Sequence, residues 1–136
     1  MRQISVLPSG CQITSKSILH VNSSNLYFTS TLALYVVDTK TYSIEKVIAL
    51  GEKLIFSIAV SPHDSNRVCS ISADGSLLCW NISEERVSHR NTLAMSAPSI
   101  LAWDPINPEI CAVVVGRNQS AYSVYLWFDY SQNNNP

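Results

Sequence analysis

Ser70–Ile82 reads SISADGSLLCWNI, and this stretch decides the fold class. Its centre, Asp74-Gly75, is a strong signal for a tight hairpin turn, because both residues tolerate the backbone conformations that such a turn requires. One short apolar run, Val68–Ile71, lies before the dipeptide, and a second, Leu77–Trp80, lies after it. The sequence therefore predicts an antiparallel hairpin. The pairs expected to face each other across it are Val68 and Trp80, Cys69 and Cys79, and Ser70 and Leu78.

This hairpin belongs to a weak internal repeat. Val37 lies 43 residues before Trp80 at the end of a similar run, and Trp127 lies 47 residues after Trp80 near the end of SVYLWFD. Pro62 in SPHDSN and Pro105 in WDPINP are also 43 residues apart. A period of about 40–45 residues is that of a β-propeller blade, which is a four-stranded sheet. The sequence therefore predicts an all-β fold of stacked blades.

Almost no segment has helical periodicity, and short runs rich in Val, Ile, Tyr and Ser alternate with Gly, Pro, Asn and Asp. We expect a partial β-propeller of two full blades and most of a third. The expected strands are Ser17–Val21, Leu26–Ser30, Ala33–Asp38 and Ile44–Leu50, then Phe56–Val60, Val68–Ser72, Leu77–Ile82 and Val87–Leu93, then Ser99–Trp103, Ile110–Val115 and Val124–Phe128. The expected division is a lead-in with an amino-terminal strand at 1–16, blade 1 at 17–50, blade 2 at 51–93, blade 3 without its last strand at 94–130, and a frayed tail at 131–136.

Charge and apolar patterning exclude several classes of partner. Nine Lys and Arg residues against ten Asp and Glu residues give a net charge of −1. No basic run stands out, so nucleic acid and a membrane surface are not expected partners. The first twelve residues lack the apolar core of a signal peptide, and no apolar run approaches the roughly 18 residues of a membrane span. We therefore expect a cytoplasmic protein.

The chain carries none of the sequence motifs that mark a catalytic or metal site. Its three histidines are isolated, and it lacks a nucleophile elbow, a phosphate-binding loop and a zinc-binding Cys-x-x-Cys pair. Asp74 could serve as a general base, but its place before Gly75 favours a turn role. Cys69 and Cys79, opposite each other in the hairpin, are either a redox-sensing pair or two buried apolar residues. We expect no enzyme, no cofactor and no metal.

The succession of an apolar strand, Ser-Pro, a small-residue strand, Asp-Gly, an apolar strand and Trp-Asn resembles that of WD repeats. The resemblance covers most of residues 17–128 and is fullest in the second repeat. It implies structural roles for Trp80 and Trp127, and a partial hydrogen-bonded network of Asp74, Trp80 and Ser72. Trp103 ends the innermost strand of blade 3, so we expect it to pack between blades. The Gly-His dipeptide usual in this family is absent from every repeat.

The number of blades predicts that this chain is incomplete as a ring. Known propellers close with about four to eight blades, and each blade buries its faces against its neighbours. The order of RQISVLPSGCQ, STLALYV and SPHDSN is also similar to the amino-terminal part of one member of the WD-repeat family, which implies a much longer chain. We therefore expect either missing propeller blades or self-association. Gln3–Leu7 could supply the fourth strand of blade 3, although three blades would have to bend too steeply to close.

Rigid blades present loops at their rims, where partners bind. We therefore expect a protein–protein interaction scaffold whose protein partners the sequence does not identify. Two alternatives stay open: a regulatory propeller domain of a larger enzyme, and a small β module that oligomerises to complete a ring. The rim residues expected to contact a partner are Gly51, Glu52, Lys53, Asp74, Ser76, Arg117 and Asn118.

Overall fold

The computed structural model describes residues 19–30, 32–49, 53–93, 97–118 and 121–128. These residues form three antiparallel sheets, each with its strands in chain order, and no helix. The first sheet contains β1 (Leu19–Val21), β2 (Asn25–Thr29), β3 (Ala33–Asp38) and β4 (Ile44–Ala49). The second contains β5 (Ile55–Val60), β6 (Arg67–Ser72), β7 (Ser76–Asn81) and β8 (Arg86–Thr92). The third contains β9 (Ala97–Trp103), β10 (Ile110–Asn118) and β11 (Ala121–Phe128).

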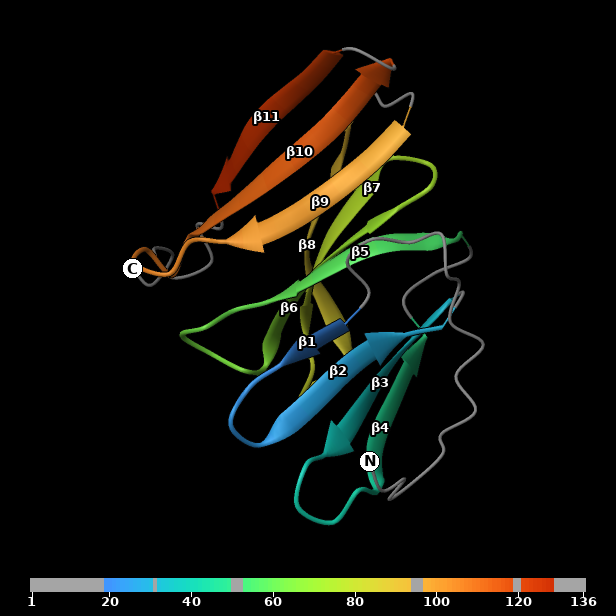
Figure 1. The fold of residues 1–136 in the computed structure, drawn as a ribbon, viewed down its shortest axis with the longest axis vertical. Coiled ribbons are helices and arrows are strands. Elements are labelled where there is room, and N and C mark those ends of the chain that lie inside the picture. Colours follow the sequence, from blue (N-terminus) through green and yellow to red (C-terminus); the bar gives the residue numbers. More distant parts are fainter. Residues whose placement is uncertain (1–18, 31, 50–52, 94–96, 119–120, 129–136) are drawn as a thin grey trace, which may run out of the picture.

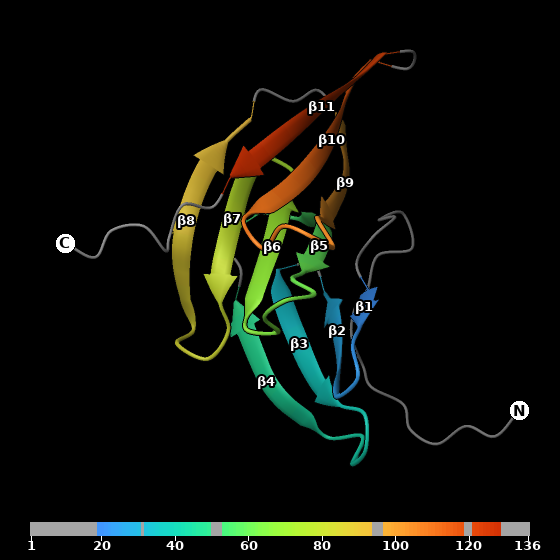
Figure 2. The same ribbon diagram turned by 90° about the vertical axis from the view of Figure 1, so that its left-hand side faces the viewer.

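The three sheets stack in chain order, with the second between the other two (Figure 1). Their first strands, β1, β5 and β9, gather on one side of the molecule, seen at the right of Figure 2. This is the arrangement of propeller blades, whose first strands line the inside of the ring. The expected all-β partial propeller is therefore confirmed.

Every strand expected within the described residues is present, and the bounds differ by at most three residues. The hairpin at Asp74-Gly75 is confirmed together with its register, since Val68 pairs with Trp80, Cys69 with Cys79 and Ser70 with Leu78. Gly75 has a φ of +83°, the left-handed conformation that glycine adopts without strain. The expected strand at Gln3–Leu7 and the tail at 131–136 lie outside the described residues.

Side chains of the second sheet alternate between two cores. One core joins the second sheet to the first and contains Ile58, Val68 and Trp80. The other joins the second sheet to the third and contains Ala59, Cys69 and Cys79. Successive residues of a strand point to opposite faces, so this alternation buries both faces of the sheet.

Trp80 is 7% exposed and forms the polar contact that fixes its ring in the first core. Its indole Nε1 donates a hydrogen bond to Ser70 Oγ at 3.1 Å. The resemblance to WD repeats suggested Ser72 for this network, and the structure replaces it with Ser70. Ser70 pairs with Leu78, so it lies diagonally across the two strands from Trp80. A long side chain can span this diagonal separation. Ser72 lies two residues further along the strand.

The third sheet has three strands among the described residues, and its face turned away from the second sheet is apolar and open. Ile100, Val124 and Leu126 are 44%, 66% and 59% exposed. Ile100 and Val124 both pair with Val114, so they lie in one row across this face. The outer face of the first sheet exposes Leu19 and Val47 in the same way. Such faces favour association.

We expect replacement of Trp80 by Ala to lower the free energy of unfolding by about 3–5 kcal/mol, the usual cost of removing a large buried aromatic side chain. Ser70→Ala removes only the hydrogen-bond acceptor and should cost about 1 kcal/mol. Urea unfolding of both variants measures the difference. A near-neutral Trp80→Ala would show that the ring does not hold the first two sheets together.

We expect the isolated 136-residue chain to self-associate through its open apolar faces. The double variant Val124→Lys with Leu126→Glu should shift the population toward monomer, because charged side chains would have to be buried in the contact. Size-exclusion chromatography with light scattering measures the mass of each. A compact wild-type monomer of 15.0 kDa with a cooperative melt would contradict this expectation.

Candidate interaction surface

The turns of the stacked sheets form two rims. The Asp-Gly rim consists of the turn at 73–75 with the flanking residues Lys53, Leu54 and Leu93. Two hydrogen bonds join these segments: Ala73 donates its amide to Leu54 O at 2.8 Å, and Leu93 donates its amide to Gly75 O at 2.9 Å. The turn and the segments before β5 and after β8 therefore form one continuous surface.

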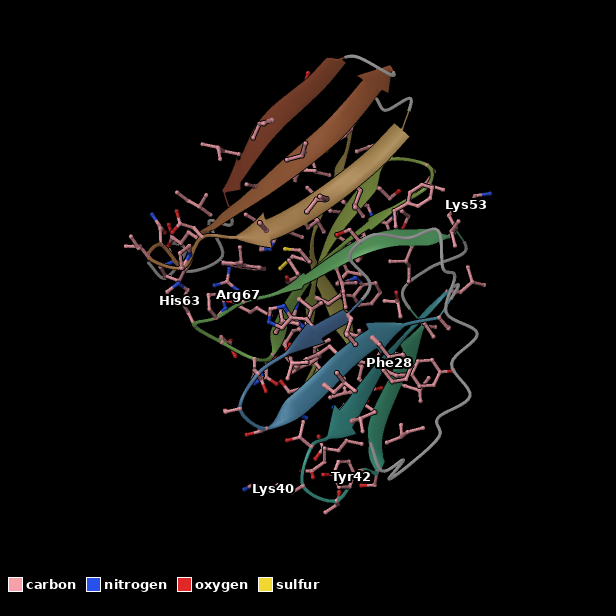
Figure 3. The ribbon with its side chains drawn as sticks, viewed as in Figure 1. Phe28, Lys40, Tyr42, Lys53, His63 and Arg67 are labelled. Atoms are coloured by element: carbon pink, nitrogen blue, oxygen red, sulfur yellow. The ribbon has the colours of Figure 1, made fainter. Side chains whose placement is uncertain are left out.

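The sequence singled out several residues of this rim. Lys53 is exposed and lies at the right of the molecule in Figure 3. Asp74 is exposed, and its Oδ1 accepts the amide of Ser76 at 3.0 Å. That hydrogen bond is the main reason why the pKa of the Asp74 carboxyl lies below its usual value. Asp74 is therefore a turn residue. Gly51 and Glu52 lie outside the described residues.

The loop prediction is wrong for three of the rim residues. Ser76 begins β7, and Arg117 and Asn118 end β10. The ladder between β10 and β11 extends across an irregularity to Asn118, which pairs with Ala121. A bulge of this kind keeps two strands paired while one of them changes its register. These residues therefore belong to strand ends.

The opposite rim, named here the proline rim, consists of loops 22–24, 39–43, 61–66, 82–85 and 104–109. Figure 3 shows His63 and Arg67 here, across the molecule from Lys53. Each hydrogen bond within the loop that follows Ser61 has a counterpart 43 residues later. At the first position of each loop, the side chains of Ser61 and Asp104 accept backbone amides. At the fourth position, the side chains of Asp64 and Asn107 do the same.

The residues that directly follow Val37 and Trp80 cap two further turns of this rim, at 39–43 and 82–85. Asp38 Oδ1 accepts the amides of Lys40 and Thr41 at 2.8 and 2.6 Å. Asn81 Oδ1, 43 residues later, accepts two amides in the same way. These acceptor contacts lower the pKa of the Asp38 carboxyl. Asp and Asn are thus interchangeable here because each supplies the required oxygen.

Side chains from one sheet reach loop carbonyls of the next at this rim. Tyr27 in β2 donates its hydroxyl to Ser65 O at 3.2 Å. Burial is the main reason why the pKa of Tyr27 is raised. Lys46 in β4 donates to Ile82 O at 3.0 Å and pairs with Glu85 at 3.5 Å. The first and second sheets are therefore joined by donors that end on main-chain oxygens.

The second and third sheets are joined by an equivalent contact. Arg67 in β6 donates from Nη1 to Pro108 O at 3.1 Å, and Pro108 lies 43 residues after Ser65. The Arg67 guanidinium also lies 5.2 Å from the centre of the Trp103 ring, a cation–π distance. Trp103 is 9% exposed and belongs to the core between these sheets, as the sequence analysis expected.

His63 makes a contact between loops that the sequence did not predict, because His63 is isolated from the other histidines in the sequence. His63 Nε2 lies 3.1 Å from Asp104 O. A carbonyl oxygen accepts only, so Nε2 is the donor and carries the hydrogen. The one available signal was the 43-residue spacing of Pro62 and Pro105. That spacing shows that the two loops are equivalent but does not show that they touch.

Three cysteines, Cys69, Cys79 and Cys111, lie in the core between the second and third sheets, and none forms a disulfide. Burial raises the pKa of the Cys69 thiol well above its usual value, which keeps it protonated and poorly nucleophilic. Over the described ranges, no group of three His, Cys, Asp or Glu residues is placed to hold a metal ion. Trp127 is paired with Cys111 through the backbone, and its side chain lies outside what is described.

No helix long and apolar enough to cross a membrane occurs in the described part. No protein-family model matches the sequence.

Among solved structures, the chain is similar to the β-propeller domain of Cps50 (Swd1) from Myceliophteria thermophila. The TM-score is 0.64 and the sequence identity is 11%, and the match covers 85% of this chain and 39% of that chain. Similarity at this identity establishes the fold alone. The chain is therefore a partial β-propeller, and it spans well under two thirds of the propeller domain that it resembles.

We expect Gly75→Ala to be strongly destabilising. An added Cβ would lie 2.2 Å from Leu93 O, and the φ of +83° is unfavourable for any residue with a Cβ. The backbone term alone costs about 1–2 kcal/mol, and the contact adds to it. Asp74→Asn is the matched control, since it keeps the capping oxygen and should stay within about 0.5 kcal/mol. Urea unfolding compares the two, and equal stabilities would rule out the tight turn.

Proposed function

We propose that this chain is a protein–protein interaction scaffold of the WD-repeat type, which acts without catalysis in the cytoplasm. The observation that carries the proposal is the continuity of the Asp-Gly rim, where Ala73 and Leu93 tie the turn at Gly75 to both neighbouring segments. Loops that are held on a stacked sheet platform lose little conformational entropy when they bind a partner. The proposed contact region includes Lys53 and Asp74.

A finer assignment rests on sequence order alone. The succession of RQISVLPSGCQ, STLALYV and SPHDSN resembles the amino-terminal part of WD repeat-containing protein 17. We infer that further blades complete this propeller, because Ile100, Val124 and Leu126 are exposed on the outer face of the third sheet. A regulatory propeller of a larger enzyme and a module that oligomerises into a ring are the alternatives.

Site-specific photocrosslinking in cells tests the proposal. A benzophenone amino acid replaces Lys53 on the Asp-Gly rim in one variant and Arg90, an exposed residue of β8, in the control. A third variant carries it at Ile106 on the proline rim, which is 88% exposed. We expect discrete crosslinked proteins from Lys53 and none from Arg90.

The outcomes separate the candidate functions. Crosslinks from Ile106 alone would keep the scaffold function and move the contact to the proline rim. Crosslinks only to a second copy of the chain would favour the oligomerising module. An absence of crosslinks at both rims, or an identical pattern from Arg90, would overturn the proposal.

A further inference from the structure

A mainly apolar cavity of about 340 Å³ opens where the first strands of the three sheets converge, next to the proline rim. Its wall includes Val60 of β5 and Trp103 of β9, and its edge is formed by Pro62 and Pro105. Pro62, which is exposed, lines the same space. A volume of this size falls within the range of about 300–1,000 Å³ that is usual for ligand pockets.

A polar hollow of about 520 Å³ adjoins this cavity, and the two share His20 and Pro62. Serine hydroxyls and asparagine amides line the hollow, and its lining contains no Asp, Glu, Lys or Arg. β1, β5 and β9 are each the first strand of their sheet, and among the described strands each pairs with one strand only. Edge strands of this kind accept extended segments. Together the cavity and the hollow form one groove.

The charges around this groove are mainly negative. Seven of the ten acidic residues of the chain lie in the loops of the proline rim or in the strand ends next to these loops. Four of the nine basic residues lie in the same segments. The acidic residues are Asp38, Glu45, Asp64, Glu84, Glu85, Asp104 and Glu109, and the basic residues are Lys40, Lys46, Arg67 and Arg86.

Most of these basic groups are already engaged. Lys46 pairs with Glu85 and Arg86 pairs with Glu84, so these two pairs neutralise two acidic and two basic residues, and Arg67 donates to Pro108 O. Asp64 and Asp104 lie in the two loops that border the groove. Amides of its own turn lower the pKa of the Asp104 carboxyl, which is therefore ionised at neutral pH. The field at the mouth of the groove therefore favours a cation.

We propose that this groove binds an extended basic peptide segment of a partner protein, which inserts one apolar side chain into the cavity between β5 and β9. The basic residues on either side of the anchor lie against Asp64 and Asp104, and the peptide backbone follows the polar hollow past His20. This inference rests on the proposed scaffold function and assigns it a partner chemistry.

Fluorescence anisotropy with the 136-residue chain tests the inference with defined peptides. The probe is a nine-residue peptide with Leu at its centre and Lys at alternate positions in a Ser background. Matched probes replace Leu by Ser, or every Lys by Glu. We expect the Lys/Leu peptide to bind best, and loss of its Leu to weaken binding about tenfold or more, since the apolar anchor is lost.

Variants of the protein locate the site. Pro62→Trp places a bulky side chain at an exposed lining residue that the cavity and the hollow share, and it should abolish binding. Asp64→Asn with Asp104→Asn keeps both capping oxygens, removes two charges and should weaken binding about two- to tenfold. Asp74→Asn, the same change on the Asp-Gly rim, is the matched control and should leave binding unchanged. Circular dichroism verifies the fold of each variant.

The proposal is overturned by any of three results: no binding of the Lys/Leu peptide, binding that Pro62→Trp leaves intact, or equal binding of the Glu peptide. The last result would assign the groove to an acidic partner. Each of these failures leaves the scaffold function standing if Lys53 still crosslinks to a partner, so the two proposals are tested separately.

Discussion

Burial of both faces of the second sheet is the constraint on which the rest of this structure depends. A strand in an open sheet needs one apolar face, whereas β6 and β7 have two. Val68 and Trp80 pack toward the first sheet, and Cys69 and Cys79 pack toward the third. Both neighbours are therefore required, and the sheets stack in the order of the chain. The rims, the groove and the joints between sheets all follow from that stacking.

The two cores differ in the size of the side chains that the second sheet supplies. Its face toward the first sheet carries Ile58 and Trp80, while its opposite face carries Ala59, Cys69 and Cys79 beside the larger Ile71 and Leu77. Small residues on that second face leave room for Leu101 and Trp103 from the third sheet. Close packing requires that large side chains of one sheet face small side chains of the other. The cysteines therefore have a packing role that does not need their chemistry.

Local patterns predicted the hairpin and its register because a tight turn fixes which residues face each other. The strand at Ala33–Asp38 was also predicted with its correct bounds. Contacts between sheets were not predictable in the same way. The sequence shows that Ser65 and Pro108 occupy equivalent positions, but the donors that reach them, Tyr27 and Arg67, are different residues in different registers. Such partners become visible only once the sheets are stacked.

The hydrogen bonds that connect neighbouring sheets at Ser65 and Pro108 are accepted by main-chain oxygens. A carbonyl is supplied by every amino acid, so the side chain at either position is free to change while the joint persists. Scanning mutagenesis of these loops would therefore score both positions as tolerant. Their role would be visible only to chemistry that alters the backbone itself, such as replacing the following amide with an ester, which weakens the carbonyl as an acceptor.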